Sequence, residues 1–236
     1  MNISDAHGLA AWDLRIRFGG ILLLFLVGLG ISILAMILSA AFEAPVFARD
    51  LVAIAAQDLG WIWGYHLLAY DRDWVSIRAR FSTVRSGVLW ACAAGAIAII
   101  LILMAADKIL TWFGIELPPL PAPNFLLGGQ GWLPATFLMV AIIGPAAEEL
   151  TIRGLLLDWL RQKMAVWPAI LVSAVIFGLF HGVALHSGAT GWLQLGARTA
   201  LGVVCAYLAV RYRSLLPSFV LHASFNGSIV VASAFL

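Results

Sequence analysis

The most constraining feature of the sequence is an uncharged apolar run from residue 18 to residue 42. A helix needs about 20 apolar residues to cross the hydrocarbon core of a bilayer, so this run is long enough to span it. The run is also too long for the apolar core of a signal peptide. We therefore expect it to be a retained first membrane span rather than a cleaved leader.

Composition excludes the main classes of soluble protein. Of 236 residues, 63% are hydrophobic and only 11% are charged, against about a quarter charged in an ordinary soluble domain. A formal net charge of +2 provides no basic stripe for nucleic acid. Cys92 and Cys205 lie in apolar runs without metal-ligand spacing, and we interpret both as small core residues. The chain is predicted to be an all-α integral membrane protein with no nucleic-acid partner.

Apolar runs divide the chain into about seven expected transmembrane helices, and short polar breaks leave six or eight open. No polar insert between them is long enough to fold alone, so we expect a single membrane domain over residues 1–236. Residues 1–130 carry no catalytic motif, whereas residues 132–236 carry all the motifs described below. The expected spans cover residues 18–42, 51–70, 86–106, 132–147, 165–185, 190–210 and 215–236.

The basic residues predict how the chain crosses the membrane. If the N-terminus is cytoplasmic, alternating loops place eleven Lys and Arg residues inside and only Arg49 and Lys108 outside. This asymmetry follows the positive-inside rule and predicts an odd number of crossings, with the C-terminus outside. Short loops and small size indicate a bacterial protein, so the expected location is the inner (cytoplasmic) membrane.

Polar side chains at membrane depth are concentrated in the last 90 residues. Such groups are costly in lipid and normally face a protein interior or a wet cavity. Before residue 130 only Asp58 and His66 stand out, and helix packing explains them most simply. The roles of His186 and Arg198 stay open. We expect Arg198, in mid-span, to pair with Glu149, with Asp58 or with backbone carbonyls.

The first polar cluster consists of Glu148, Glu149 and Arg153. Adjacent helical residues point about 100° apart, so the two carboxylates cannot share one target. Glu149 and Arg153 are four residues apart and can pair on one face. Glu148 then faces elsewhere without a local counter-charge, which suits a general base that takes a proton from water. By itself the cluster also fits a membrane-surface helix with an ordinary salt bridge.

Two further clusters each place a histidine one helical turn from a second residue. Phe177 and His181 share one face of a helix, and His222 and Asn226 share one face of the last expected span. An imidazole and a carboxamide aimed the same way offer two donors to a developing oxyanion. Each cluster alone is explained more simply by core packing or an interhelical hydrogen bond. Three clusters on three helices favour a functional site.

In order, the patterns Glu-Glu-x-x-x-Arg, Phe-x-x-x-His and His-x-x-x-Asn resemble the CAAX prenyl protease and bacteriocin-processing (CPBP) family of intramembrane proteases. The resemblance covers about residues 132–236 and implies a membrane-embedded endopeptidase of the glutamic type. It implies that Glu148 activates a water with the help of His181. It also assigns the oxyanion to His222 and Asn226, and a supporting role to Glu149, Arg153 and Phe177. The implied partner is a membrane-bound peptide or protein substrate, such as a prenylated C-terminus.

Several alternatives stay open at this point. Glu148, His181 and His222 could form a His₂Glu zinc set, but the His-Glu-x-x-His motif is absent, so a reaction without a cofactor is favoured. A non-proteolytic membrane scaffold or bacteriocin-immunity protein could bind a peptide in the same cavity. A proton-coupled carrier would use Asp58, His66 and Glu148 as relay groups, but the lack of sequence repeats argues against it.

The expected depths of the motif residues do not agree with one another. At 1.5 Å per residue, upright helices would separate His181 from His222 by about 12 Å. Glu148 would lie near the cytoplasmic end of its span. For one site to form, the fourth span must kink at Gly144-Pro145, or the chain after Glu149 must continue into the bilayer.

Overall fold

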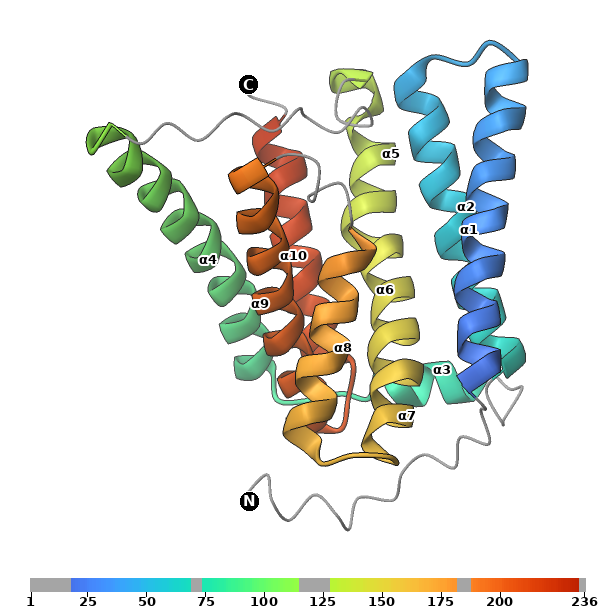
Figure 1. The fold of residues 1–236 in the computed structure, drawn as a ribbon, viewed down its shortest axis with the longest axis vertical. Helices are drawn as coiled ribbons and strands as arrows, with labels where there is room; N and C mark the ends of the chain where they lie inside the picture. Colours follow the sequence, from blue (N-terminus) through green and yellow to red (C-terminus); the bar gives the residue numbers. More distant parts are fainter. Residues whose placement is uncertain (1–17, 69–73, 115–127, 182–187, 234–236) are drawn as a thin grey trace.

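The computed structural model describes residues 18–68, 74–114, 128–181 and 188–233. These residues are helical and contain no β-strand, which confirms the all-α prediction (Figure 1). A continuous helix of 32 residues, Gln130–Arg161, takes the place of the expected fourth span. The other helices are α1 (Phe18–Ala41), α2 (Val46–Leu68), α3 (Trp74–Arg80), α4 (Ser86–Trp112), α8 (Val166–Phe180), α9 (Gly188–Tyr212) and α10 (Leu216–Ser233).

Seven of the described helices run lengthwise through the bundle, and the short α3 lies across its lower end in Figure 1. Among the described residues, four helices are long and apolar enough to cross a membrane, and α8 and α10 are apolar but shorter. Helix α1 begins at the lower end and α10 finishes at the upper end, as an odd number of crossings requires (Figure 1). The chain is therefore a multi-pass integral membrane protein.

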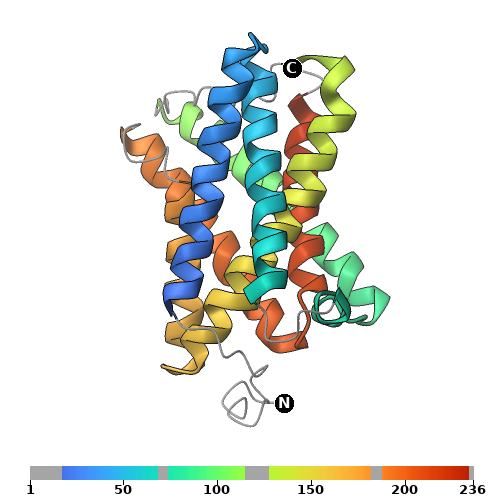
Figure 2. The same ribbon diagram turned by 90° about the vertical axis from the view of Figure 1, so that its right-hand side faces the viewer.

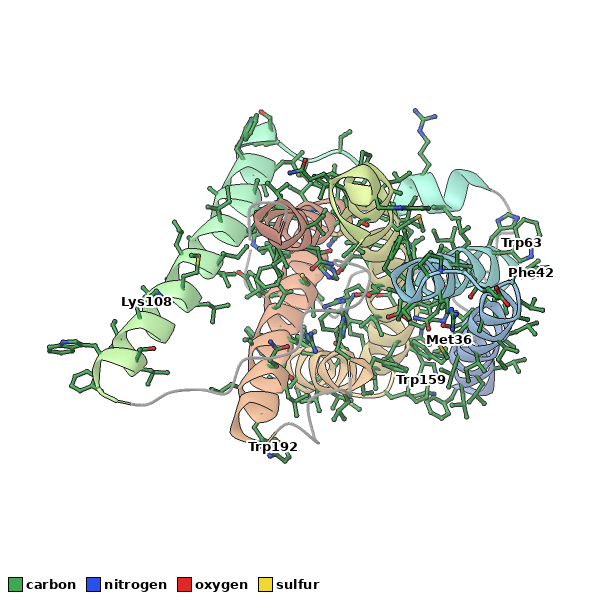
Figure 3. The ribbon with its side chains drawn as sticks, turned by 90° about the horizontal axis from the view of Figure 1, so that it is seen from above. Met36, Phe42, Trp63, Lys108, Trp159 and Trp192 are labelled. Carbon is green, nitrogen blue, oxygen red and sulfur yellow. The ribbon has the colours of Figure 1, made fainter. Side chains whose placement is uncertain are left out.

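The outer surface of the bundle is apolar. Met36, Phe42, Trp63 and Trp192 lie on the perimeter when the bundle is viewed from above (Figure 3), and all four are exposed. Large exposed apolar patches are unusual on a water-soluble protein. This surface is the one expected of helices in contact with lipid.

The basic side chains divide between the two ends of the bundle. The turns between α3 and α4, between Arg161 and α8, and between α9 and α10 lie at the same end (Figure 1). Helix α2 begins and α4 finishes at the other end, so Arg49 and Lys108 are both there. Arg153, one of the eleven basic residues predicted inside, is not in a loop but buried in the helix Gln130–Arg161. The other described basic residues have the expected asymmetry, and the cytoplasmic side of the bundle stays a prediction. The basic residues in or beside the first three turns are Arg78, Arg80, Arg85, Arg161, Lys163, Arg211 and Arg213; Arg15, Arg17 and Arg72 lie outside the described residues.

The helix Gln130–Arg161 corrects the predicted end of the fourth span. We expected that span to end at Ala147, but the helix continues through Glu148 and Glu149 to Arg161. It continues because Glu149 is ion-paired within the helix, while Leu150 and the residues that follow it pack into the core. Its parts are η3 (Gln130–Trp132), α5 (Leu133–Phe137), η4 (Leu138–Ile143), α6 (Gly144–Glu148), η5 (Glu149–Leu157) and α7 (Asp158–Arg161), with wide π-helical turns in η4 and η5.

The longer helix resolves the part of the depth mismatch that concerns Glu148 and His181. Glu148 now lies in mid-helix, roughly 20 Å from the Arg161 end at 1.5 Å per residue. His181 directly follows the last residue of α8, which begins at Val166 and therefore places His181 at a similar depth. The second of the two expected solutions, a helix that continues past Glu149, is the one the structure adopts.

Small residues let α8 and α9 pack closely. A Cβ added at Gly178 would collide with the Thr199 hydroxyl, and one added at Gly202 would lie 3.1 Å from the Cα of Ala174. The motif helices are thus drawn together between the α1–α2 pair on one side and α4 on the other (Figures 1 and 2). Both cysteines are buried in the contact between α4, α9 and α10 and are unpaired, which confirms them as core residues.

Candidate active site

Glu148 lies between the two motif histidines. Its Oε1 is 3.9 Å from His181 Nε2, and its Oε2 is 3.6 Å from His222 Nε2. The three side chains come from the helix Gln130–Arg161, from the end of α8 and from α10, so all three motifs meet in one place. Glu148 Oε2 is buried and has no hydrogen-bond partner among the described residues.

Glu149 forms the ion pair that its spacing predicts. Its Oε1 lies 3.2 Å from Arg153 Nη1 one turn later, and both side chains are completely buried. Arg153 also donates to the carbonyl oxygen of Gly202 on α9, at 3.3 Å. The close approach of α9 that Gly202 permits therefore also brings an acceptor to the buried guanidinium.

His222 connects the two glutamates. Its Nδ1 donates to Glu149 Oε1 at 3.1 Å, because an ionised carboxylate paired with Arg153 can only accept. The proton of the neutral imidazole is then on Nδ1, and the lone pair of Nε2 faces Glu148. A carboxylate that orients an imidazole through the ring nitrogen farther from the reacting group is a familiar arrangement in catalytic sites.

His181 is oriented in the same way by a backbone group. Its Nδ1 donates to the carbonyl oxygen of Phe177 at 2.9 Å, which leaves the Nε2 lone pair facing Glu148. The Phe177 ring lies 4.7 Å from the His181 ring and 5.5 Å from the His222 ring, centroid to centroid. Arg153 stacks over the same ring at 4.4 Å. Phe177 thus packs against both imidazoles and against the guanidinium of the buried ion pair.

Part of the site is exposed. The His181 side chain is 30% exposed and that of Glu148 is 20% exposed, whereas His222 is almost completely buried. Within the described residues, Glu148 and His181 are therefore the members of this group that a small polar molecule or a peptide group can reach, whereas His222 is enclosed.

Asn226 lies on the same helix face as His222 but has a separate partner. Its Nδ2 donates to the backbone carbonyl of Val140 at 3.0 Å. Val140 lies in η4, two turns before Glu148 in the chain. The structure thus brings Glu148, His181 and His222 together, and it directs one amide hydrogen of Asn226 toward the backbone.

Two residues with open roles lie close to the site. Arg198 donates from Nη1 to the carbonyl oxygen of His181 at 3.1 Å and interacts electrostatically with Glu148. Of the partners considered for it, the backbone carbonyl is the one observed. Asp58 on α2 is buried, packs against Gly144 and also interacts electrostatically with Glu148. Both were visible in the sequence as mid-span charges, but nothing in their spacing connected them with Glu148.

Two further histidines were expected at membrane depth, His66 and His186. His66 lies on α2 with its ring 5.9 Å from that of Trp63. His186 lies outside the described residues. Of the membrane-depth histidines that the structure describes, only His181 and His222 therefore adjoin Glu148.

The proposed zinc set was tested against the observed geometry. The two imidazole Nε2 atoms and the Glu148 carboxylate are a suitable donor set by chemistry. However, no group of three or more His, Cys, Asp and Glu side chains within the described ranges is placed so that it could hold a metal ion. The described residues are therefore assigned no metal site, and a zinc-dependent reaction stays an alternative that chelation can test.

Comparisons with known proteins agree with the motifs. Residues 130–228 match the family model described as Type II CAAX prenyl endopeptidase Rce1-like. The chain is also similar to "Putative membrane peptidase YdiL" of Bacillus subtilis (strain 168), with 28% identity over 99 residues. That alignment covers 42% of this chain and 37% of the relative, so the chain spans little more than a third of the relative's length. No solved structure matches.

The matched segment begins with the helix that carries Glu148 and extends past Asn226 on α10. It therefore contains all three motifs and leaves out α1 to α4. The helices that carry the motifs match the Rce1-like type II CAAX prenyl endopeptidase family, which confirms the resemblance inferred from the sequence.

Proposed function

We propose that this chain is an intramembrane endopeptidase that hydrolyses peptide bonds with a water activated by Glu148. The observation that carries the proposal is the meeting of Glu148 with the Nε2 atoms of His181 and His222 inside a membrane bundle. Both imidazoles have their Nδ1 hydrogens engaged elsewhere, so three acceptors face one another. Acceptors at this distance repel one another unless a donor lies between them.

A water molecule is the simplest such donor. The separations of 3.6 and 3.9 Å exceed the 2.7–3.2 Å of a direct hydrogen bond, and a gap of this kind suits a bridging water. The water would donate one hydrogen to the Glu148 carboxylate and the other to an imidazole Nε2. Both donations increase the negative charge on its oxygen, which becomes the nucleophile.

Hydrolysis then follows in two proton transfers. As the water oxygen bonds to the carbonyl carbon of the peptide, Glu148 takes the proton that it was accepting. The tetrahedral intermediate collapses when the C–N bond breaks, and the protonated Glu148 gives that proton to the leaving amine. Water has then been added across the peptide bond, and Glu148 returns to its ionised state.

The surrounding residues keep these groups in place. Glu149 holds the His222 ring, and Arg153 keeps Glu149 ionised at the centre of the bundle. Arg198 caps the end of α8 at the residue that carries the second imidazole. Its guanidinium places a positive charge near the site where negative charge develops on the substrate oxygen.

The proposed substrate is a membrane-bound peptide or protein, with a prenylated C-terminus as the first candidate. The similar Bacillus protein is described as a membrane peptidase, and the matched family is described by its CAAX prenyl substrates. The partly exposed side chains of Glu148 and His181 lie within the bundle, where a lipid-anchored chain could approach. We propose the bacterial inner membrane as the location.

Replacement of Glu148 by Gln tests the proposal. Glutamine keeps the size and hydrogen bonding of the side chain but cannot take a proton. In proteoliposomes, cleavage of a farnesylated fluorescent peptide and of an unprenylated transmembrane peptide should fall by about 100-fold or more. Glu43→Gln, the same change at an exposed turn between α1 and α2, is the matched control and should leave cleavage unchanged. Full activity of Glu148→Gln would exclude the proposed mechanism.

Two further measurements separate this proposal from the alternatives. A peptide-binding scaffold would bind the farnesylated peptide but cleave it in neither the parent nor the Glu148→Gln protein. A zinc enzyme would lose cleavage after exhaustive chelation and regain it with added Zn²⁺. We expect cleavage by the parent protein to survive chelation.

A further inference from the structure

The hydrogen bond between Asn226 and Val140 has a cause in the sequence of the opposite helix. In η4 the backbone bonds span five residues, and the Gly144 N–H donates to the carbonyl of Met139 rather than to that of Val140. In the same five-residue register, the N–H that would donate to the Val140 carbonyl belongs to residue 145. That residue is proline, which has no N–H. The Val140 carbonyl is therefore left without a backbone donor in either the four-residue or the five-residue register.

Asn226 supplies the missing donor. Its Nδ2 lies 3.0 Å from the Val140 oxygen, within the normal range for a hydrogen bond. A carbonyl left unsatisfied inside a membrane bundle costs considerable free energy. Pro145 itself is buried, so water has poor access to this part of the helix.

The packing beside Asn226 is adapted to this contact. A Cβ added at the neighbouring Gly227 would lie 3.2 Å from the ring of Phe137 and 3.5 Å from the Cβ of Ala141. Glycine at this position thus lets α10 approach η4 closely enough for a short amide side chain to reach the backbone. Helix α10 then contacts the helix of Glu148 at two levels one turn apart, through His222 and through Asn226.

We propose that Asn226 is a positioning residue that replaces the backbone hydrogen bond missing at Pro145, with one of its two amide hydrogens. The contact fixes α10 along the axis of the opposite helix and so sets the distance from His222 to Glu148. The inference rests on the proposed function for its activity readout. Its structural part, the partnership of Asn226 with Val140, does not.

A double-mutant cycle between Asn226 and Pro145 tests the proposal. Pro145→Ala restores an N–H that can donate to Val140, and this makes the Asn226 side chain redundant for that contact. In the parent, Asn226→Ala should lower kcat for the farnesylated peptide by about 10- to 100-fold through misplacement of His222. In the Pro145→Ala background the factor by which the same change lowers kcat should be at least about fivefold smaller, because the restored N–H already supplies the positioning contact.

A residue that acted only as an oxyanion donor would behave differently, because its loss would lower kcat by the same factor in both backgrounds. That result would overturn the proposal. Pro145→Ser also restores the N–H and provides a second background if Pro145→Ala does not fold.

The thermal unfolding midpoint provides a readout that does not require activity. We expect Asn226→Ala to lower it by about 2–4 °C in the parent and by much less in either Pro145 variant. Equal decreases in all backgrounds would contradict the partnership of Asn226 with Val140. Because the cycle can be repeated with Glu148→Gln present, it tests the positioning role even if the proposed protease activity fails.

Discussion

The helices before residue 114 and the helix Gln130–Arg161 differ in the share of their residues that other helices bury. In the most apolar window of each span, 50% of the residues of Gln130–Arg161 are buried, against 22% in α1 and 11% in α4. Most of the surface of α1 and α4 therefore faces lipid. Half of the residues in the window of Gln130–Arg161, the helix that carries Glu148, are covered by protein. In a bilayer, charged groups are tolerated where neighbouring helices cover them on all sides, and here that is the case in the second region, the helices after residue 128.

Two buried charges before residue 114 lie against the second region and support this contrast: one is Arg80, which pairs with Asp158, and the other is Asp58. It is the one acidic side chain of α2 that is almost fully buried, and it lies against Gly144 of the motif helix rather than within the α1–α2 pair. The polar interior of the second region thus extends to the surface of α2 that it contacts. A charged residue of either region is therefore buried where another helix covers it, whatever its position in the sequence.

The largest difference between the two regions is expected when one charge of the buried Glu149–Arg153 pair is removed. Arg153→Ala leaves Glu149 completely buried without its guanidinium partner, and we expect the free energy of unfolding to fall by about 3–5 kcal/mol. Arg49→Ala, which removes a donor to the Ala44 carbonyl, should cost about 1 kcal/mol. Denaturant unfolding in detergent micelles measures both. Equal losses would show that the two regions tolerate charge removal alike.

A second comparison concerns the histidines at membrane depth in the two regions. His222→Ala should lower peptide cleavage by about 100-fold, because the lost imidazole faces Glu148. His66→Ala on α2 should leave cleavage within about twofold of the parent. Steady-state kinetics on the farnesylated peptide give both values. A large loss for His66→Ala would bring α2 into the catalytic machinery.

The smallest expected effect distinguishes glycines in the two regions. Gly178→Ala would drive a methyl group into Thr199 and Leu195, and such overpacking costs about 1–3 kcal/mol. At Gly95 on α4 an added Cβ meets nothing within 4 Å, and alanine should be neutral or slightly stabilising by about 0.5–1 kcal/mol. Thermal unfolding of the two variants provides the test. A destabilised Gly95→Ala protein would mean that α4 has a partner on that side.

The sequence predicts the apolar spans well because lipid selects for hydrophobic length. The run from 18 to 42 carries no charge, and the structure forms α1 over nearly the same residues. The end predicted at Ala147 is wrong because charge alone does not terminate a helix whose carboxylate is already paired. Hydropathy along the chain cannot register that Arg153, one turn later, compensates Glu149.

The motif spacings predicted which residues share a helix face but not which helices meet. Glu149 pairs with Arg153 as expected from four-residue spacing. The approach of His181 to Glu148 depends on where α8 ends and on how far the opposite helix extends, and both are set by packing. The partner of Asn226 could have been sought from Pro145, since a proline within a helix always leaves a carbonyl without its donor.

The Glu149–Arg153 pair also bears on how the protein is made. Both partners belong to one helix and lie one turn apart, so their charges can be compensated before α8, α9 and α10 have been synthesised. The helix can therefore pass from the translocation machinery into lipid with the charges of Glu149 and Arg153 neutralised. The lower free energy of transfer favours its insertion. Helices α9 and α10 then pack against a helix whose buried charges are already paired, and their assembly completes the site.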